Sequence, residues 1–161
     1  MRVLIVSDTH GRLDHFEEIL ENEDPFDLCV HCGDFEGQED IIYEMTGPEC
    51  ACVMVPGNND YLSNLPREKT IKIGKLTAWI THGHNYYVSM DPAIIGEEAQ
   101  SRYVDIVMFG HTHKPLIQFM GGVLLINPGS LTYPRQEGRR PSYVVLEIDG
   151  REILDAHIEY M

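Results

Sequence analysis

Residues that commonly bind metal ions recur along the whole chain, each time just after a short apolar segment. They are carboxylates, imidazoles and one carboxamide: Asp8, His10, Asp34, Asn58, His82, His111 and His113. Divalent metals of hard and borderline character take ligands of these types, and a set of this size can serve two ions. In open α/β sheets, ligands bind at the carboxyl ends of the strands. The pattern therefore predicts a metal centre at such an edge.

Other polar residues near these motifs invite different interpretations. Any single histidine could simply stabilise a loop, but that coincidence would have to hold at every strand end. His84 is expected to be a general acid, a phosphate contact or a support for a metal ligand. His31 lies within an apolar strand, which favours the core or a position behind a ligand. Asp60 is expected to fix its own loop through backbone hydrogen bonds, and the loop 127–130 to shape the rim of the site.

The length and the cysteines limit the type of protein. A chain of 161 residues can bury a sizeable core, and we expect one domain spanning residues 1–161. The apolar run Val3–Val6 is too short for a signal peptide or a membrane span, which predicts a cytoplasmic protein with no membrane partner. Cysteines are then expected to be reduced. Cys29 and Cys32 have redox or zinc spacing, but residues three apart on a strand face opposite sides, which favours a core role.

The charge argues against one class of partner. The formal net charge is −14, whereas binding of long nucleic acid requires clustered lysines and arginines. One basic cluster, Arg135, Arg139 and Arg140, is either a solvated loop or a contact for a small phosphorylated substrate or a partner subunit. A homodimer or higher homo-oligomer could form through the C-terminal hairpin, or through Tyr86 and Tyr87 if they are exposed.

Strand and helix patterns alternate over the first 60 residues. Apolar runs predict strands at 2–6, 28–31 and 52–55, and helical spacing predicts helices around 13–20 and 41–45. This order implies parallel strands joined by crossovers. The remaining signals predict hairpins at 69–81, 115–126 and 142–160, and a helix at 93–103 followed by a strand at 105–109. Together they indicate two packed sheets covered by helices.

At these motifs the chain resembles the calcineurin-like metallophosphoesterase superfamily, and within it the small single-domain bacterial and archaeal phosphodiesterases. The matching blocks, in the family's order, are SDTHG, HCGDF, GNND, THGH, FGHTH and INPGS. The resemblance implies a four-layer α/β/β/α sandwich with a dinuclear metal site. It implies that the first ion is held by Asp8, His10 and His113, the second by Asn58, His82 and His111, and that Asp34 bridges both. Without metal, the proximity of Asp8 and Asp34 would be expected to raise a carboxyl pKa.

The function implied by the resemblance is hydrolysis of small phosphodiesters by attack of a metal-bridging hydroxide, with two divalent ions about 3.5–4 Å apart. Mn²⁺ is the first expectation, with Fe, Zn²⁺, Co²⁺ and Ni²⁺ as alternatives. One position departs from much of the superfamily, because Asn59 stands where a histidine assists the leaving group. An amide can donate a hydrogen bond to a phosphoryl oxygen but cannot supply a proton. The general acid is therefore left open.

Two other functions compete with this interpretation. A non-catalytic scaffold or interaction subunit can share the same fold, although its site is expected to be degenerate, and here all seven expected ligands are present. A phosphomonoesterase is the enzymatic alternative, but protein phosphatases of the superfamily are longer and carry the histidine that Asn59 replaces. The sequence leaves the substrate open among cyclic nucleotides, glycerophosphodiesters, dinucleotides and phosphorylated metabolites.

Overall fold

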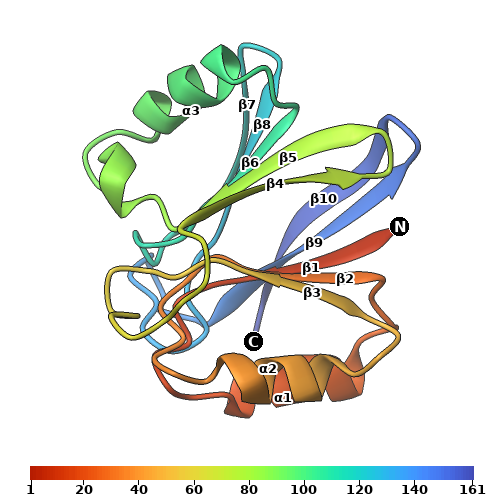
Figure 1. Ribbon diagram of the computed structural model, residues 1–161, viewed down its shortest axis with the longest axis vertical. Helices are drawn as coiled ribbons and strands as arrows, with labels where there is room; N and C mark the ends of the chain where they lie inside the picture. The colour runs from red at the N-terminus through yellow and green to blue at the C-terminus, as the bar shows by residue number, and fades with distance from the viewer.

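Two five-stranded sheets face each other, and helices cover the outer face of each (Figure 1), in a computed structural model that describes residues 1–161. The first sheet consists of β1 (Arg2–Val6), β2 (Leu28–His31), β3 (Ala51–Met54), β9 (Ser142–Asp149) and β10 (Glu152–Tyr160). The second consists of β4 (Glu68–Ile73), β5 (Leu76–Thr81), β6 (Ile106–Met108), β7 (Pro115–Met120) and β8 (Val123–Pro128). Helices α1 (Asp14–Asn22) and α2 (Glu39–Thr46) lie on the first sheet, and α3 (Pro92–Ser101) lies on the second. This confirms the expected four-layer sandwich.

Both sheets are mixed, and each has parallel strands at its centre. In the first sheet β1, β2 and β3 are parallel, and β9 pairs with β1 antiparallel and carries β10 to the edge. In the second sheet β5, β6 and β8 are parallel, with β4 and β7 antiparallel at the two edges. Because the parallel strands run the same way, the loops at their carboxyl ends gather at one edge of the sandwich. Strand β3 lies one residue earlier than predicted, and β6 is shorter than the predicted 105–109.

The core follows the two-residue period of the strands. On β1, Val3 and Ile5 belong to the cluster between the two sheets, whereas Leu4 and Val6 pack towards α1 and α2. The same alternation confirms the prediction for the cysteines, since Cys29 faces the helices and Cys32 faces the other sheet. All four cysteines are free thiols. Trp79 anchors a third cluster beneath α3.

One segment differs from its expected role. The sequence did not predict the short 3₁₀ helix η1 (His84–Tyr86), which follows β5. Tyr86 at its end is half-buried, and its hydroxyl is bonded to Glu68 and Arg102 within the chain. The expectation that Tyr86 is exposed and could form a homodimer contact is therefore wrong. Tyr87, the other tyrosine named for this contact, is 64% exposed. Among the helices, none has both the length and the apolar character needed to cross a membrane.

Candidate metal centre

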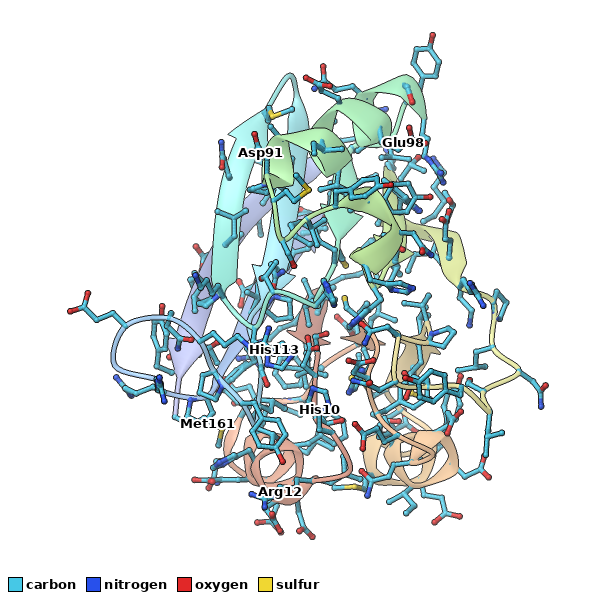
Figure 2. All side chains as sticks on the ribbon, turned by 90° about the vertical axis from the view of Figure 1, so that its left-hand side faces the viewer. His10, Arg12, Asp91, Glu98, His113 and Met161 are labelled. Carbon is cyan, nitrogen blue, oxygen red and sulfur yellow. The ribbon has the colours of Figure 1, made fainter.

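The seven predicted ligands come together at the carboxyl edge of the two sheets. Asp8 and His10 follow β1, Asp34 follows β2, Asn58 follows β3, His82 follows β5, and His111 and His113 follow β6. Figure 2 shows His10 from the first sheet's side lying close to His113 from the second. The Nε2 atoms of these two histidines are 3.3 Å apart. The cluster is thus built from both halves of the sandwich.

Two groups of side chains in this cluster could each hold an ion. In the first group, His113 Nε2 is 3.1 Å and His10 Nε2 is 3.9 Å from Oδ1 of Asp8. In the second group, His82 Nε2 is 3.5 Å from Oδ2 of Asp34 and 4.0 Å from Oδ1 of Asp8. Asp8 belongs to both groups, whereas the resemblance assigns the bridging role to Asp34. The assignment of each ligand to one ion therefore stays a prediction.

Asn58 and His111 lie beside the second group. Oδ1 of Asn58 is 3.2 Å from Nε2 of His82. The ring of His111 lies 5.3 Å from that of His82, centre to centre. Burial lowers the pKa of His111, so this imidazole is neutral near pH 7 and has a lone pair available for a metal.

Three of the histidines are oriented by bonds to their outer nitrogen. Nδ1 of His10 lies 2.8 Å from Oε1 of Glu36. Nδ1 of His82 lies 2.7 Å from the carbonyl oxygen of Cys32, and Nδ1 of His113 lies 2.7 Å from that of Tyr133. Because these partners accept hydrogen bonds, each Nδ1 carries the proton and each Nε2 presents a lone pair to the cluster. Metal-binding histidines are held in this way. Sequence reasoning missed Glu36 and Tyr133, which lie outside the ligand motifs.

This arrangement leaves electron pairs facing each other without a partner. With their protons on Nδ1, His10 and His113 present two bare Nε2 atoms 3.3 Å apart. Oδ1 of Asp8 is fully buried and lacks a hydrogen bond. Buried lone pairs in such proximity repel unless a cation or a proton lies among them. The donors are imidazole nitrogens and carboxylate oxygens, so the residues present fit a divalent metal.

The ionisation of Asp8 differs from the sequence-based expectation. Burial alone would raise its pKa, but His113 and His82 outweigh that effect and lower the pKa to about 2. The expectation considered only the second carboxylate and neglected the imidazoles that the second sheet supplies. Conversely, burial lowers the pKa of His113, yet the Asp8 carboxylate 3.1 Å from its Nε2 favours the protonated ring and leaves the pKa raised above its ordinary value. Asp8 is therefore an anion at any moderate pH.

Backbone strain is concentrated in the ligand loops. Five of the candidates have left-handed φ angles: Asp8 (56°), His10 (45°), Asp34 (58°), His111 (67°) and His113 (57°). Such a conformation costs a non-glycine residue roughly 1–2 kcal/mol. Position 110 requires glycine for a different reason, because the backbone there lies so close to Ser7 and Asp8 that a Cβ would collide with their side chains. Strain clustered in this way is typical of functional sites.

The loops after β2 and β3 are tied together by two neighbouring residues. The Asp60 carboxylate accepts hydrogen bonds from the backbone N–H groups of Gly57, Asp34 and Glu36 at 2.7, 2.7 and 2.6 Å. This confirms its expected loop-fixing role and extends it to a second loop. The Asn59 side chain donates to Oδ2 of Asp34, and its backbone N–H donates to Oδ1, both at 2.8 Å. Asn59 thus positions Asp34, while its contact with a phosphoryl oxygen stays a prediction.

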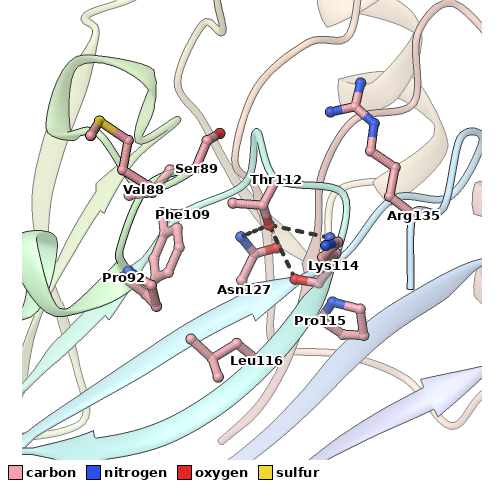
Figure 3. Close-up of a pocket in the computed structure, with 11 residues that line it drawn as sticks. Val88, Ser89, Pro92, Phe109, Thr112, Lys114, Pro115, Leu116, Asn127 and Arg135 are labelled. Carbon is pink, nitrogen blue, oxygen red and sulfur yellow. Dashed lines mark hydrogen bonds between the residues drawn. The ribbon is translucent and has the colours of Figure 1, made fainter. Parts of the chain in front are cut away.

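The loop carrying His111 and His113 is supported from the opposite side. Nδ2 of Asn127 donates to the carbonyl of Gly110 at 2.8 Å. It also donates to Oγ1 of Thr112 at 3.0 Å (Figure 3). Farther along, Ser130 Oγ donates to the carbonyl of Asp8 at 2.8 Å. The loop 127–130 is buried and holds the two ligand loops in place, while its role at the rim of the site stays a prediction.

His84 and His31 flank the cluster in different ways. His84 is half-buried, with its ring centre 5.4 Å from that of His82, and it lines a cavity of about 260 Å³ with Asn58 and Arg67. Burial, reinforced by the neighbouring histidines, lowers its pKa to about 4. A neutral imidazole can donate a hydrogen bond but does not readily give up its proton. This favours contact with the phosphate over general acid catalysis as the role of His84. His31 is fully buried and bonded to Thr9 at 3.1 Å, as expected for a supporting residue.

A mixed double-sheet sandwich with an Asp, His and Asn cluster at its carboxyl edge defines the metallophosphoesterase class. The sequence profile of the calcineurin-like phosphoesterase superfamily domain matches residues 1–151. The chain belongs to this superfamily.

Named relatives agree with this assignment. The chain is 32% identical to the probable metallophosphoesterase YsnB of Bacillus subtilis (strain 168), over 93% of this chain and 86% of that protein. It is 31% identical to phosphodiesterase MJ0936 of Methanocaldococcus jannaschii, over 80% of this chain and 83% of that protein.

Solved structures share the fold across the whole chain. A conserved protein of Streptococcus pneumoniae, described as a predicted phosphoesterase, superposes with a TM-score of 0.84 at 27% identity, covering 99% of this chain and 88% of that one. A single-residue variant of Vps29 from Entamoeba histolytica superposes with a TM-score of 0.79 at 26% identity, covering 100% of this chain and 98% of that one.

Proposed function

We propose that the protein is a two-metal phosphodiesterase acting on small phosphodiesters in the cytoplasm. The observation that carries this proposal is the pair of overlapping ligand groups, in which three imidazoles turn Nε2 inward and Asp8 keeps a buried oxygen without a partner. The similarity to the archaeal protein named as a phosphodiesterase supports a diester as the substrate.

We take the division of the ligands between two ions from the resemblance to the superfamily. Asp8, His10 and His113 would hold one ion, Asn58, His82 and His111 the other, and Asp34 would be shared. Bound metals supply Lewis acidity, which activates water near neutral pH and neutralises charge on the phosphate. Mixed oxygen and imidazole ligands suit Mn²⁺.

The chain's own residues orient the substrate and limit its chemistry. His84 lies at the edge of the cluster and, as a neutral imidazole, can donate a hydrogen bond to a phosphate oxygen. Asn59 holds Asp34 and has no acidic proton to give. With no proton donor at either position, the departing group must leave as an anion. This favours substrates whose leaving group is stable as an anion.

A scaffold or interaction subunit is the second candidate, because Vps29 structures superpose on nearly the whole chain. A phosphomonoesterase is the third. Steady hydrolysis of bis(p-nitrophenyl) phosphate after loading with Mn²⁺, and slower hydrolysis of p-nitrophenyl phosphate, would support the diesterase. The reverse preference would indicate a monoesterase. Activity on neither ester with Mn²⁺, Zn²⁺, Co²⁺, Ni²⁺ or Fe²⁺ would leave the scaffold as the better proposal.

Self-association is proposed separately from catalysis. Strand β10 forms one edge of the first sheet, and its unpaired backbone groups could pair with a second copy. Light scattering of the purified chain would give the mass directly, and a mass equal to 18.4 kDa would contradict the homo-oligomer.

A further inference from the structure

A second cavity (Figure 3) is lined in part by the loop that carries His111 and His113. Its volume is about 410 Å³, which is in the usual range for small-molecule sites. We call the segment between Gly110 and Lys114 the shared loop, because Thr112 lines the cavity while His111 and His113 on either side of it are candidate metal ligands that do not. A ligand in this cavity would touch that loop without touching any of the seven candidate metal ligands.

The walls of this cavity combine apolar surface with positive charge. The apolar part is formed by Val88, Met90, Pro92, Phe109, Pro115 and Leu116. Thr112 and Asn127 add a hydroxyl and an amide, and Lys114 and Arg135 add two cations. None of the chain's 26 Asp and Glu residues lines the cavity. The charged side chains of this cavity are therefore all positive, in a protein whose formal net charge is −14.

The two cations are free to act on a ligand. The chain's arginine salt bridges use Arg2, Arg102 and Arg151, so Arg135 has no carboxylate partner, and Lys114 has none either. The backbone N–H of Arg135 donates to the carbonyl of His113 at 2.9 Å, which fixes the start of its side chain beside the shared loop.

The basic cluster noted in the sequence therefore divides into separate roles. Arg140 donates to the carbonyls of Tyr160 and Met161 and is used to hold the C-terminus. Arg139 lies on the same loop but does not line the cavity. Only Arg135 of the three reaches the cavity, where Lys114 joins it.

We propose that this cavity is a binding site, separate from the metal centre, for a small organic anion that joins an apolar body to a phosphate or carboxylate group. The apolar body would pack on Phe109 and Leu116, and its removal from water would supply part of the affinity. The anionic group would be bound by Lys114 and Arg135, whose charge-assisted hydrogen bonds give selectivity over neutral molecules. The apolar body alone, or the anionic group alone, would bind only weakly.

The test uses 1-naphthyl phosphate as the probe and the full chain freed of metal by chelation. Calorimetric titration should show binding of 1-naphthyl phosphate, with methyl phosphate and 1-naphthol each bound at least about tenfold more weakly. Arg135→Met and Lys114→Met should each weaken binding of 1-naphthyl phosphate by about tenfold, the usual order for one charge-assisted contact. Arg139→Met is the matched control and should bind as the wild type does.

The apolar wall is tested by Leu116→Asn, which should weaken 1-naphthyl phosphate but leave methyl phosphate unchanged. Amide chemical shifts should move at Val88 and Leu116 rather than at Asn58 and Asn59. Wild-type affinity in both Arg135→Met and Lys114→Met, equal binding of methyl phosphate, or shifts confined to the metal centre would overturn the proposal. Because binding is measured without metal, the result is independent of whether the chain hydrolyses phosphodiesters.

Discussion

The two sheets contribute to the metal centre in chemically different ways. The first sheet supplies both carboxylates and the carboxamide, together with one histidine: Asp8, Asp34, Asn58 and His10. The second sheet supplies imidazoles alone: His82, His111 and His113. Each of the two candidate ligand groups takes side chains from both sheets. A bound ion would therefore cross-link the two sheets at their open edge.

The supports of the two ligand sets differ as well. The carboxylate side is tied by several donors at once, since both oxygens of Asp34 accept from Asn59 and the loop behind them is held by Asp60. In the second sheet, His82 and His113 each depend on a single acceptor, the carbonyls of Cys32 and Tyr133. The first sheet therefore supplies the negative charge of the site, and the second supplies three of its four candidate imidazoles.

The largest effect should come from Asp34, the carboxylate that we propose both ions share. Asp34→Asn keeps the size of the side chain but removes its charge, so turnover should fall by about 10³-fold or more and metal should be held less tightly. Rates with bis(p-nitrophenyl) phosphate and metal content by elemental analysis are the measurements. Asp40→Asn, an exposed acid on α2, is the control and should behave as wild type. Unimpaired turnover with full metal content in Asp34→Asn would remove this residue from the centre.

The second test exploits the opposite responses of the two sides to pH. In the metal-free chain the raised pKa of His113 means that its charged form stabilises the fold at low pH, and that this contribution is lost as pH rises through the raised pKa. The pKa of Asp8 is lowered to about 2, so the Asp8 carboxylate stays charged and stabilises the fold beside His113 until the pH falls towards that value. Metal binding needs neutral imidazoles, so it competes with that proton.

The rise in melting temperature caused by Mn²⁺ should therefore be small near pH 5.5 and should grow towards about pH 8, because the free histidine pKa is about 6.5. Metal affinity should change by about 10²-fold over this range if two imidazole protons are displaced, because each contributes about tenfold between pH 5.5 and the free histidine pKa. Calorimetric melting with and without Mn²⁺ is the measurement. A constant increment across the range would show that the histidines are not ligands.

The next test changes the leaving-group side. If no general acid is present, rates should fall steeply as the pKa of the leaving group rises, and aryl diesters should be cleaved far faster than alkyl diesters. Asn59→His should accelerate alkyl diesters by roughly tenfold or more, with little change for aryl diesters. Because Asn59 also holds Asp34, Asn59→Ala is the matched control that loses the same bond without adding an imidazole. A shallow dependence in the wild type would indicate an existing acid, and His84 would be the first residue to replace.

The smallest effect on metal binding is expected from replacing Glu36, whose carboxylate accepts a hydrogen bond from His10. Glu36→Gln retains an acceptor for Nδ1 but removes the charge, and Glu36 is partly exposed, with 42% of its side chain accessible. Loss of such a supporting carboxylate should weaken metal binding by about tenfold, at the low end of the usual range. Titration of the metal-free variant with Mn²⁺ would measure this. A loss as large as that in Asp34→Asn would mean that Glu36 is itself a ligand.

Much of this architecture was accessible from the sequence, because apolar periods of two and of about 3.6 residues mark strands and helices directly. The predicted strand at 28–31 coincides with β2, and the hairpins at 69–81 and 115–126 pair as expected. Every metal-ligand candidate lies at the predicted edge, since each follows a strand whose direction was implied by the order of elements. The order of strands within each sheet was not predictable, because local patterns do not specify which strands pair.

The remainder depends on contacts between distant segments. Glu36 and Tyr133 support histidines 26 and 20 residues away, and nothing in their local sequence indicates this. Tyr86 was expected to be free for an interface, but a bond network with Glu68 and Arg102 uses it inside the chain. The hydrogen bond from the Asn59 amide to Asp34 joins two loops 25 residues apart, and the motif around Asn59 does not indicate it.

We propose that two ions join the two sheets, and the number of ions bound per chain is the most direct test. Mn²⁺ titrated into the metal-free chain at about pH 7.5, where ligand imidazoles are mostly neutral, should bind at two sites per chain. The melting temperature should rise as both sites fill. Binding of a single ion, or of none, by a chain that is folded and active on phosphodiesters would contradict the account.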